Sequence, residues 1–269
     1  MTRRYAEVIG DPIAHSKSPI IHGFWLAALG IEADYRACHV TPDALADYFA
    51  DRIADPAWSG CNITIPHKIA ALDHVADPGG VRNSIGAANT VARNELGQPF
   101  ATNTDPGGFY APIAGLDLDG APIVVIGAGG AARAILFALS RIGVGSVTLL
   151  NRNVLKGAAL LASFGLKGTA LPLGSPIPPA ALLVNASALG MKGHPGLDVD
   201  LSTLPDHAVV YDIVYAPLET PLLAAARARE LDTIDGLEML IAQAALAFEI
   251  LFGTEPPRDR DDELRALLI

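Results

Sequence analysis

Four short segments of the sequence gather small polar side chains of the kind that bind a hydroxylated acid. They are Ser16-Lys17-Ser18, residues 62–68, Asn89-Thr90 and Asn103-Thr104-Asp105. Together they offer hydroxyls, carboxamides, the carboxylate of Asp105 and the ammonium of Lys68. Taken singly, Ser18, Thr64 and Asp105 are just as typical of helix caps, and Lys68 of a solvated helix start. Their joint occurrence in one chain favours a lining for a small polyhydroxylated acid.

A glycine-rich turn forms a second candidate site. Residues 122–126 have the apolar pattern of a buried strand, residues 133–142 have a helical pattern, and Gly127-Ala128-Gly129-Gly130-Ala131-Ala132 joins them. Gly127, Gly129 and the small Ala132 fit the pattern G-x-G-x-x-G/A, in which glycine permits the sharp turn and a close approach to a pyrophosphate. Amides at the start of the helix then bind the phosphates. The pattern predicts a dinucleotide site; a purely structural strand–turn–helix is the alternative.

The end of the following strand indicates which dinucleotide binds. A site that reads a ribose 2′-hydroxyl usually places Asp or Glu there, but residues 147–150 end at Asn151-Arg152, and Lys156 follows one turn later. A guanidinium beside an ammonium suits a 2′-phosphate. We therefore predict NADP (NADPH) rather than NAD.

The elements that position the first group of polar residues alternate between strand and helix. We expect strands at residues 5–9, 33–40 and 58–65, and helices at 20–29 and 42–53. Ser18-Pro19 has the cap-plus-proline pattern of a helix start, and Pro66 is expected to begin a helix that carries His67 and Lys68. Short paired segments at 86–91 and 99–103 then lead to a domain crossing at Thr104-Asp105. This alternation predicts an α/β unit of roughly a hundred residues.

The second domain is expected to contain the glycine turn and further buried parallel strands at residues 181–187 and 208–215. Residues 236–253 form a long helix that is apolar on nearly all sides, so it must be buried, and Gln243 in its middle needs a polar partner. We expect it to pack between the domains or to return to the first one. The predicted division is residues 1–105 plus 237–269, and residues 106–236.

Composition narrows the class of protein. The chain has 269 residues, of which 51% are hydrophobic and 18% charged, which is typical of a compact globular protein. Its formal net charge of −10 disfavours a nucleic-acid partner. Cys38 and Cys61 lack zinc-type or disulfide-type spacing, and the most apolar stretch is too short to span a membrane. We expect a reduced, metal-free, soluble cytoplasmic protein that acts on a small molecule.

In their order along the chain, these motifs resemble the shikimate dehydrogenase family from end to end. The resemblance rests on residues 10–13 and 15–19, on residues 62–68 and 86–90, on Asn103-Thr104-Asp105, on residues 127–131 and on Asn151-Arg152. Further matches are Asn185-Ala186-Ser187, residues 212–215, residues 220–223, and Asp235-Gly236 leading to Met239-Leu240 and Gln243. So many motifs in sequence make the resemblance specific.

The resemblance implies an α/β fold of two domains: an N-terminal α/β substrate domain and a Rossmann-type, doubly wound NADP-binding domain, with C-terminal helices returning to the first. It implies an oxidoreductase of the shikimate pathway that reversibly reduces 3-dehydroshikimate to shikimate with NADPH, for aromatic amino-acid biosynthesis. Substrate and nicotinamide are expected to meet between the domains of a monomer or homodimer.

The resemblance also implies residue roles. Lys68 and Asp105 would be the catalytic pair, with Lys68 the acid/base. Ser16 and Ser18 would bind the substrate carboxylate, and the substrate hydroxyls would be bound, or the site ordered, by Thr64, Asn89, Asp105, Tyr215 and Gln243. Gly127, Ala128, Gly129, Gly130 and Ala131 would hold the pyrophosphate. The 2′-phosphate would lie at Asn151, Arg152 and Lys156, and the nicotinamide near Ile213 and Gly236.

Several positions depart from the family pattern. Gly23 replaces a common Asn, Asn153 a frequent Thr, and Lys156 a frequent Arg, which keeps the charge but loses the planar fork. Ser187-Ala188 and Phe252 also differ from the usual residues. None of these changes removes a catalytic group, but they are compatible with a paralogue that prefers a different substrate.

Four alternatives follow from the same residues. The nearest is a shikimate-dehydrogenase-like enzyme that prefers quinate or a related polyol acid. A methylenetetrahydrofolate dehydrogenase also pairs a lysine with two domains, but the Ser-Lys-Ser-Pro and Asn-Thr-Asp segments argue against it. A catalytically silent NADP-binding module predicts loss of Lys68 or Asp105, and both are present. If the chain were a structural interaction protein, the joint occurrence of the polar segments would be accidental.

Overall fold

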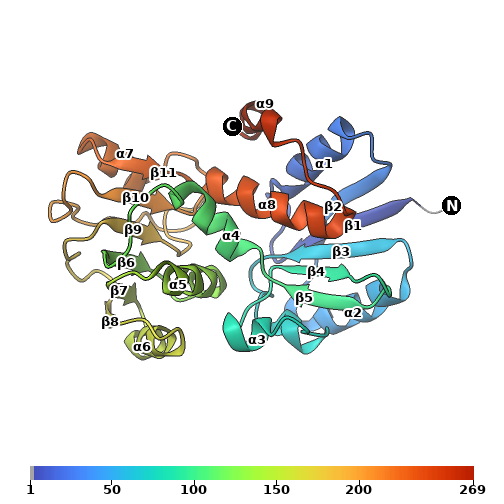
Figure 1. Ribbon diagram of the computed structural model, residues 1–269, viewed down its shortest axis with the longest axis horizontal. Coiled ribbons are helices and arrows are strands. Elements are labelled where there is room, and N and C mark those ends of the chain that lie inside the picture. The colour runs from blue at the N-terminus through green and yellow to red at the C-terminus, as the bar shows by residue number, and fades with distance from the viewer. Residues whose placement is uncertain (1–2) are drawn as a thin grey trace. The chain divides into compact units, whose positions relative to one another are not determined.

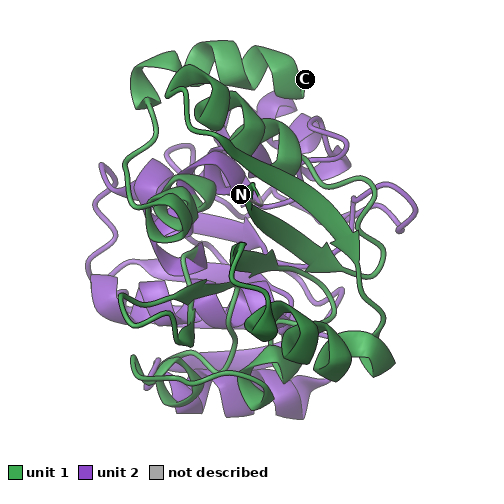
Figure 2. Cartoon of the chain, turned by 90° about the vertical axis from the view of Figure 1, so that its right-hand side faces the viewer, with its two compact units in different colours: residues 1–104, 243–269 green, residues 105–242 purple. Residues whose placement is uncertain are grey.

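The computed structural model describes residues 3–269 and divides the chain into two compact units (Figure 2). Unit 1 contains the chain up to Thr104 and from Gln243 onward, and unit 2 contains Asp105–Ala242. Residues 237–242, which we expected in the first domain, group with unit 2, because Met239 packs into the core of that unit. Helix α8 (Gly236–Phe252) therefore begins in unit 2 and ends in unit 1.

Unit 1 is built on a mixed five-stranded sheet (Figure 1). Its strands are β1 (Arg4–Gly10), β2 (Ala33–His39), β3 (Trp58–Ile63), β4 (Thr90–Arg93) and β5 (Pro99–Thr102), in the spatial order β2-β1-β3-β4-β5. β1 pairs in parallel with β2 and β3, and β3, β4 and β5 pair antiparallel. Because β1 and β3 are parallel neighbours, their carboxyl ends lie at the same end of the sheet, and two of the polar segments follow these strand ends.

The helices of unit 1 are short. They are α1 (Ser18–Ala28), η1 (Pro42–Ala44), α2 (Leu45–Ala54), η2 (Ala70–Asp73), α3 (Val81–Ser84), η4 (Arg258–Arg260) and α9 (Asp261–Leu268). Proline lies in the first turn of α1 and η1, where its missing amide hydrogen costs nothing. A buried cluster that includes Phe49, Trp58 and Ile63 packs α2 against the sheet. The expected helix from Pro66 is absent: residues 65–69 form turns, and only the 3₁₀ turn η2 follows.

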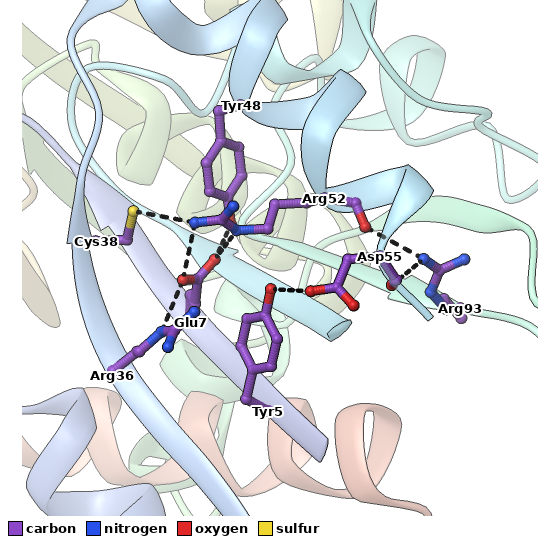
Figure 3. Close-up of polar contacts among 8 residues, drawn as sticks. All are labelled: Tyr5, Glu7, Arg36, Cys38, Tyr48, Arg52, Asp55 and Arg93. Atoms are coloured by element: carbon purple, nitrogen blue, oxygen red, sulfur yellow. Dashed lines mark hydrogen bonds and ion pairs between the residues drawn. The ribbon is translucent and has the colours of Figure 1, made fainter. Parts of the chain in front are cut away.

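A buried carboxylate joins β1, β2 and α2 in unit 1 (Figure 3). Glu7 is 1% exposed and accepts hydrogen bonds from Arg36 Nε at 3.0 Å, from Arg52 Nε at 2.7 Å and Nη2 at 3.3 Å, and from the Tyr48 hydroxyl at 2.9 Å. Arg93 donates to the last carbonyls of α2, at Arg52, Ile53 and Asp55. The buried charge is thus surrounded by donors, as a buried carboxylate requires.

Unit 2 is built on a six-stranded sheet in which every pairing is parallel. Its strands are β6 (Pro122–Ile126), β7 (Ser146–Asn151), β8 (Gly168–Pro172), β9 (Leu182–Asn185), β10 (Val209–Asp212) and β11 (Asp232–Ile234), in the order β11-β10-β9-β6-β7-β8. Read from β8 and counted within the unit, this order is 3-2-1-4-5-6, which is the doubly wound order of dinucleotide-binding domains. The order reverses between β6 and β9, so a ligand is expected at their carboxyl ends.

Helices cover both faces of this sheet. They are α4 (Asp105–Tyr110), η3 (Ala111–Ile113), α5 (Gly130–Ile142), α6 (Val154–Ser163) and α7 (Pro221–Ala228). Ile123 and Val125 of β6 belong to one buried cluster with α4, α5 and α6, whereas Val124 and Ile126 belong to another with α7 and residues 197–208. Because successive side chains point to opposite faces, a strand covered on both must be apolar throughout. This explains the uninterrupted apolar run of β6.

Residues 3–269 contain neither a membrane-spanning helix nor a cluster of metal ligands. In this part of the chain no helix is long and apolar enough to cross a membrane. No group of three or more His, Cys, Asp or Glu side chains is placed to hold a metal ion within the same residues.

Candidate active site

The turn between β1 and α1 carries Ser16 and Ser18. The Ser16 amide donates to the Ile13 carbonyl at 3.0 Å, and the Ser16 hydroxyl accepts from the Ser18 amide at 3.3 Å. We expected Ser18 to cap α1, but Lys17 occupies the N-cap position, and no side chain caps the helix. Ser18 therefore has no capping role that would account for its presence.

The segment after β3 places Thr64 and Lys68 in unit 1. The Thr64 amide donates to the Ile9 carbonyl at 2.9 Å, which fixes the end of β3 beside that of β1. His67 is 1% exposed, and its ring nitrogen lies 2.7 Å from the Val40 carbonyl oxygen. The Lys68 carbonyl accepts from the Ala88 amide at 2.7 Å. These long-range bonds, rather than helical ones, hold the half-buried Lys68, which explains why the expected helix is absent.

Asn89 is the centre of a buried polar group. Its oxygen accepts from the Thr104 amide at 2.8 Å and from the Thr90 hydroxyl at 2.9 Å. Its nitrogen donates to Thr104 Oγ1 at 2.8 Å and to Gln243 Oε1 at 3.2 Å. Gln243 lies in a helix that is otherwise largely apolar, and the prediction that it has a polar partner is confirmed by its hydrogen bond with Asn89. Because the amide of Asn89 is engaged on both sides, its side chain is suited to ordering the site.

Two further predicted residues lie in unit 2. Asp105 is the first residue of α4 and is 3% exposed. It follows directly on Thr104, so the Asn89 group fixes the chain just before it. Tyr215 lies in the loop after β10, where burial raises the pKa of its hydroxyl. The structure therefore groups Lys68 and Asp105 with different compact units.

The glycine turn after β6 has the backbone that its sequence predicts. Gly127 has φ +110°, and a Cβ built on it would lie 2.9 Å from the Ala186 carbonyl oxygen, so another residue would be strained and crowded. A Cβ on Gly129 would have open space around it. Gly129 is also the N-cap of α5, and no side chain caps this helix. The helix thus begins without a side-chain cap, beside open space at the switch point of the sheet, which suits a pyrophosphate.

The end of β7 carries the predicted basic residues. Arg152 and Lys156 are exposed, and the first turn of α6 contains no acid. Asn151 Nδ2 donates to the Asn153 carbonyl at 2.9 Å, and Asn153 Oδ1 caps α6 by accepting from the Lys156 amide at 3.0 Å. Asn and Thr are both good N-caps, so Asn153 keeps the turn intact despite departing from the family pattern. The residues present fit a 2′-phosphate.

Ile213 and Gly236 lie at the far end of the same sheet. A Cβ on Gly236 would lie 2.4 Å from the Ile213 carbonyl oxygen, so only glycine permits this approach of two backbones. Asp212, which is fully buried, accepts from the Val214 amide at 3.0 Å and the Thr220 hydroxyl at 2.7 Å. Sequence reasoning assigned Asp212 no role, although a carboxylate at the end of an apolar strand is a signal for one. Burial raises its pKa.

The doubly wound sheet, the glycine turn at its switch point and the basic residues after β7 define the Rossmann class of dinucleotide-binding proteins. A family model described as the shikimate dehydrogenase substrate binding domain matches residues 8–91, and one described as the shikimate 5′-dehydrogenase C-terminal domain matches residues 236–261. A protein of Sphingopyxis alaskensis named shikimate dehydrogenase (NADP(+)) is 65% identical over 98% of this chain and 97% of its own length. The chain belongs to the shikimate dehydrogenase family.

Solved structures agree with this assignment. The shikimate 5-dehydrogenase of Thermus thermophilus, in complex with NADP(H) and shikimate, matches with a TM-score of 0.86 and 37% identity, covering 99% of this chain and 100% of that chain. The quinate dehydrogenase of Corynebacterium glutamicum, in complex with NAD, matches with a TM-score of 0.87 and 30% identity, covering 98% of this chain and 99% of that chain. The expected two-domain α/β fold with a Rossmann-type domain is confirmed.

Proposed function

We propose that this chain is an NADP-dependent shikimate dehydrogenase that reversibly reduces 3-dehydroshikimate to shikimate in aromatic amino-acid biosynthesis. One observation carries the proposal: unit 2 has an uncapped helix start at Gly129 and two exposed cations, Arg152 and Lys156, in a doubly wound sheet. The name of the 65% identical relative supports the same activity. Most of the residues assigned to the substrate lie in unit 1, and those assigned to the cofactor lie in unit 2.

In this proposal Gly127, Ala128, Gly129, Gly130 and Ala131 hold the pyrophosphate of the cofactor. Its 2′-phosphate is held by Asn151, Arg152 and Lys156, and its nicotinamide lies near Ile213 and Gly236. When bound, NADPH supplies the hydride. The cations then favour NADP over NAD, because they have no acid in their own turn to pair with.

Lys68 and Asp105 are the proposed catalytic residues. Reduction of a ketone develops negative charge on its oxygen, which an ammonium stabilises and protonates. Lys68 has that role, and in the reverse direction it takes the proton back. Asp105, buried at the start of α4, supplies the carboxylate that fixes the reacting groups.

The remaining roles concern the substrate. Ser16 and Ser18, on the turn before α1, bind its carboxylate. Its hydroxyls are bound, or the site is ordered, by Thr64, Asn89, Asp105, Tyr215 and Gln243. Because the amide of Asn89 is hydrogen bonded on both sides, we assign Asn89 the role of ordering Thr104 and Gln243.

The test mixes purified protein with shikimate and NADP and measures the rise in absorbance as reduced nicotinamide forms. Quinate and NAD are measured in parallel. The proposal predicts the highest kcat/KM for shikimate with NADP. A higher kcat/KM for quinate would establish the alternative, an enzyme that prefers quinate. The similarity to a quinate dehydrogenase structure is the reason to test it. No turnover of either shikimate or quinate would refute a dehydrogenase of this substrate class.

Two further parts of the proposal concern the protein in the cell. We assign the enzyme to the cytoplasm, and we expect it to be a monomer or a homodimer. Fractionation of cells and light scattering of the purified protein test these assignments directly. Recovery of the protein outside the cytoplasm, or an assembly larger than a dimer, would contradict them.

A further inference from the structure

The carboxylate of Asp212 bridges the ends of two neighbouring strands in unit 2 (Figure 1). Asp212 is the last residue of β10 and Asn185 the last of β9, and the two lie opposite each other in the parallel pairing. Asp212 Oδ1 accepts from Asn185 Nδ2 at 2.8 Å and from the Val214 amide at 3.0 Å, and Oδ2 accepts from the Thr220 hydroxyl at 2.7 Å. The proposed roles above use neither Asp212 nor Asn185.

Backbone groups fix the orientation of the Asn185 side chain. Its oxygen accepts from the Ser187 amide at 3.1 Å, and a backbone amide only donates. Its nitrogen donates to the Leu189 carbonyl oxygen at 2.9 Å, and a carbonyl oxygen only accepts. The nitrogen of Asn185 is therefore the atom that faces Asp212 Oδ1. Both side chains are 0% exposed, so water does not compete for the bond between them.

Asn185 connects the bridge to the turn after β9. The Ser187 hydroxyl donates to Asn185 Oδ1 at 2.7 Å and accepts from the Leu189 amide at 3.1 Å, so this turn is held in one conformation. The turn lies against the glycine turn after β6, because a Cβ on Gly127 would lie 2.9 Å from the Ala186 carbonyl oxygen. The side chain of Asn185 thus supports the backbone beside the proposed pyrophosphate site.

Val214 connects the bridge to the loop after β10. Its amide donates to the carboxylate of Asp212, which fixes the first residues of that loop. Gly236 approaches the same residues so closely that a Cβ on it would lie 2.4 Å from the Ile213 carbonyl oxygen. Ile213 and Gly236 are the residues proposed to lie near the nicotinamide. One carboxylate therefore holds both the turn beside the pyrophosphate and the loop beside the nicotinamide.

The residues proposed for the 2′-phosphate lie outside this bridge. Arg152 and Lys156 follow β7, and β6 and β9 separate β7 from β10 in the sheet. Three strand spacings place the ends of β7 and β10 about 14 Å apart. A change at Asp212 should therefore affect the nicotinamide half of the cofactor and spare the half that carries the 2′-phosphate.

We propose that Asp212 and Asn185 are positioning residues of the cofactor site, which couple the turn after β9 to the loop after β10. The coupling keeps the surfaces for the pyrophosphate and the nicotinamide in one arrangement before the cofactor binds. Because both side chains are fully buried, they act through these backbone segments and do not touch the cofactor. The inference rests on the proposed function and adds two residues to it.

The test measures, by titration calorimetry, the binding of two ligands to the variant Asp212→Ala. One ligand is NADP, and the other is adenosine 2′,5′-bisphosphate, which has the 2′-phosphate but no nicotinamide. If the released segments hold the bound arrangement about a tenth of the time, the Kd for NADP rises about tenfold. We expect the Kd for the bisphosphate to change by less than about twofold, because Arg152 and Lys156 are left in place.

Two further variants distinguish positioning from a loss of stability. Asp212→Asn keeps an oxygen for Asn185 and Val214, so it should restore the Kd for NADP to within about threefold of the wild type. Val210→Ala is the matched control, because Val210 lies on the same strand and face as Asp212 and is also 0% exposed. It removes packing but no bond of the bridge. It should lower Tm and leave both Kd values unchanged.

Asn185→Ala removes the same bridge from β9 and provides the measurement if Asp212→Ala does not fold. It should also weaken the binding of NADP and spare the bisphosphate. An unchanged Kd for NADP, equal weakening of both ligands, or an Asp212→Asn variant as weak as Asp212→Ala would overturn the inference while the wild type still binds NADP and oxidises shikimate. A wild type that fails to bind NADP would overturn the proposed function and this inference with it.

Discussion

Arg52 is the residue whose loss should damage unit 1 most among the partners of Glu7. The variant Arg52→Ala leaves the Glu7 carboxylate 1% exposed, with two of its four hydrogen bonds gone. Arg36 and Tyr48 remain, so the charge is only partly compensated. The expected result is a large loss of stability without any change in the residues assigned to substrate or cofactor.

The magnitude follows from the geometry around Glu7. Removing one partner of a buried ion pair costs about 3–5 kcal/mol. The side chain of Arg52 is 25% exposed, and two other donors stay in place, so we expect the lower end, about 3 kcal/mol. Arg36 is 55% exposed and gives Glu7 one bond, so Arg36→Ala should cost about 1 kcal/mol or less.

The assay is urea unfolding of the wild type and both variants, followed by circular dichroism with activity measured in parallel. Because the chain has two compact units, coincident transitions by both probes must be checked before free energies are compared. Equal destabilisation by Arg36→Ala and Arg52→Ala would contradict the larger role of Arg52. A cost of Arg52→Ala under about 1 kcal/mol would contradict it too, since a buried carboxylate that loses half its donors should cost more than that.

Three further predictions follow from single residues. Gly23 lies inside α1 with open space where a Cβ would be, so Gly23→Ala should stabilise the protein by about 0.5–1 kcal/mol. Gly157→Ala in α6 is its control and should destabilise, because that Cβ would lie 2.7 Å from Leu149 Cδ2; equal effects in urea unfolding would contradict this. Burial lowers the pKa of His22 to about 3, from an ordinary 6.5, so its contribution to stability is present above pH 6.5 and is lost as pH falls towards 3. Between about pH 6 and 4 the wild type should therefore lose about 1.4 kcal/mol per pH unit more than His22→Phe, and parallel stability curves would refute this. Arg152→Ala should raise KM for NADP about tenfold and leave KM for NAD nearly unchanged, as losing one charge-assisted bond implies, and steady-state kinetics with equal effects on both cofactors would count against a 2′-phosphate contact.

Local patterns predicted the dinucleotide-binding part of the fold well. The strand expected at residues 122–126 is β6, and the helix expected at residues 133–142 is the body of α5, which begins three residues earlier at Gly130. The apolar run and the glycines determine this backbone through contacts near in sequence. β8 and β11 were not predicted, because their exposed or half-buried residues carry no clear alternation.

The candidate site was less predictable where distant residues decide the structure. Pro66 looked like a helix start, but the bonds from Ala88 to Lys68 and from His67 to Val40 produce turns instead. Tyr35 and Asn62 are 27 residues apart, and neither has a sequence signal that pairs it with the other. Motifs identified the residue types of the site, whereas its internal hydrogen bonds needed the fold.

The most direct test of the proposed activity is oxidation of NADPH by 3-dehydroshikimate, with wild type and Lys68→Ala compared at saturating substrate. Rapid oxidation by the wild type, a loss of about 10²- to 10⁴-fold in kcat for the variant and an unchanged Kd for NADPH are the predicted results. A variant with near-normal turnover would remove Lys68 from the acid/base role, and a wild type that leaves NADPH unoxidised would contradict the proposed function itself.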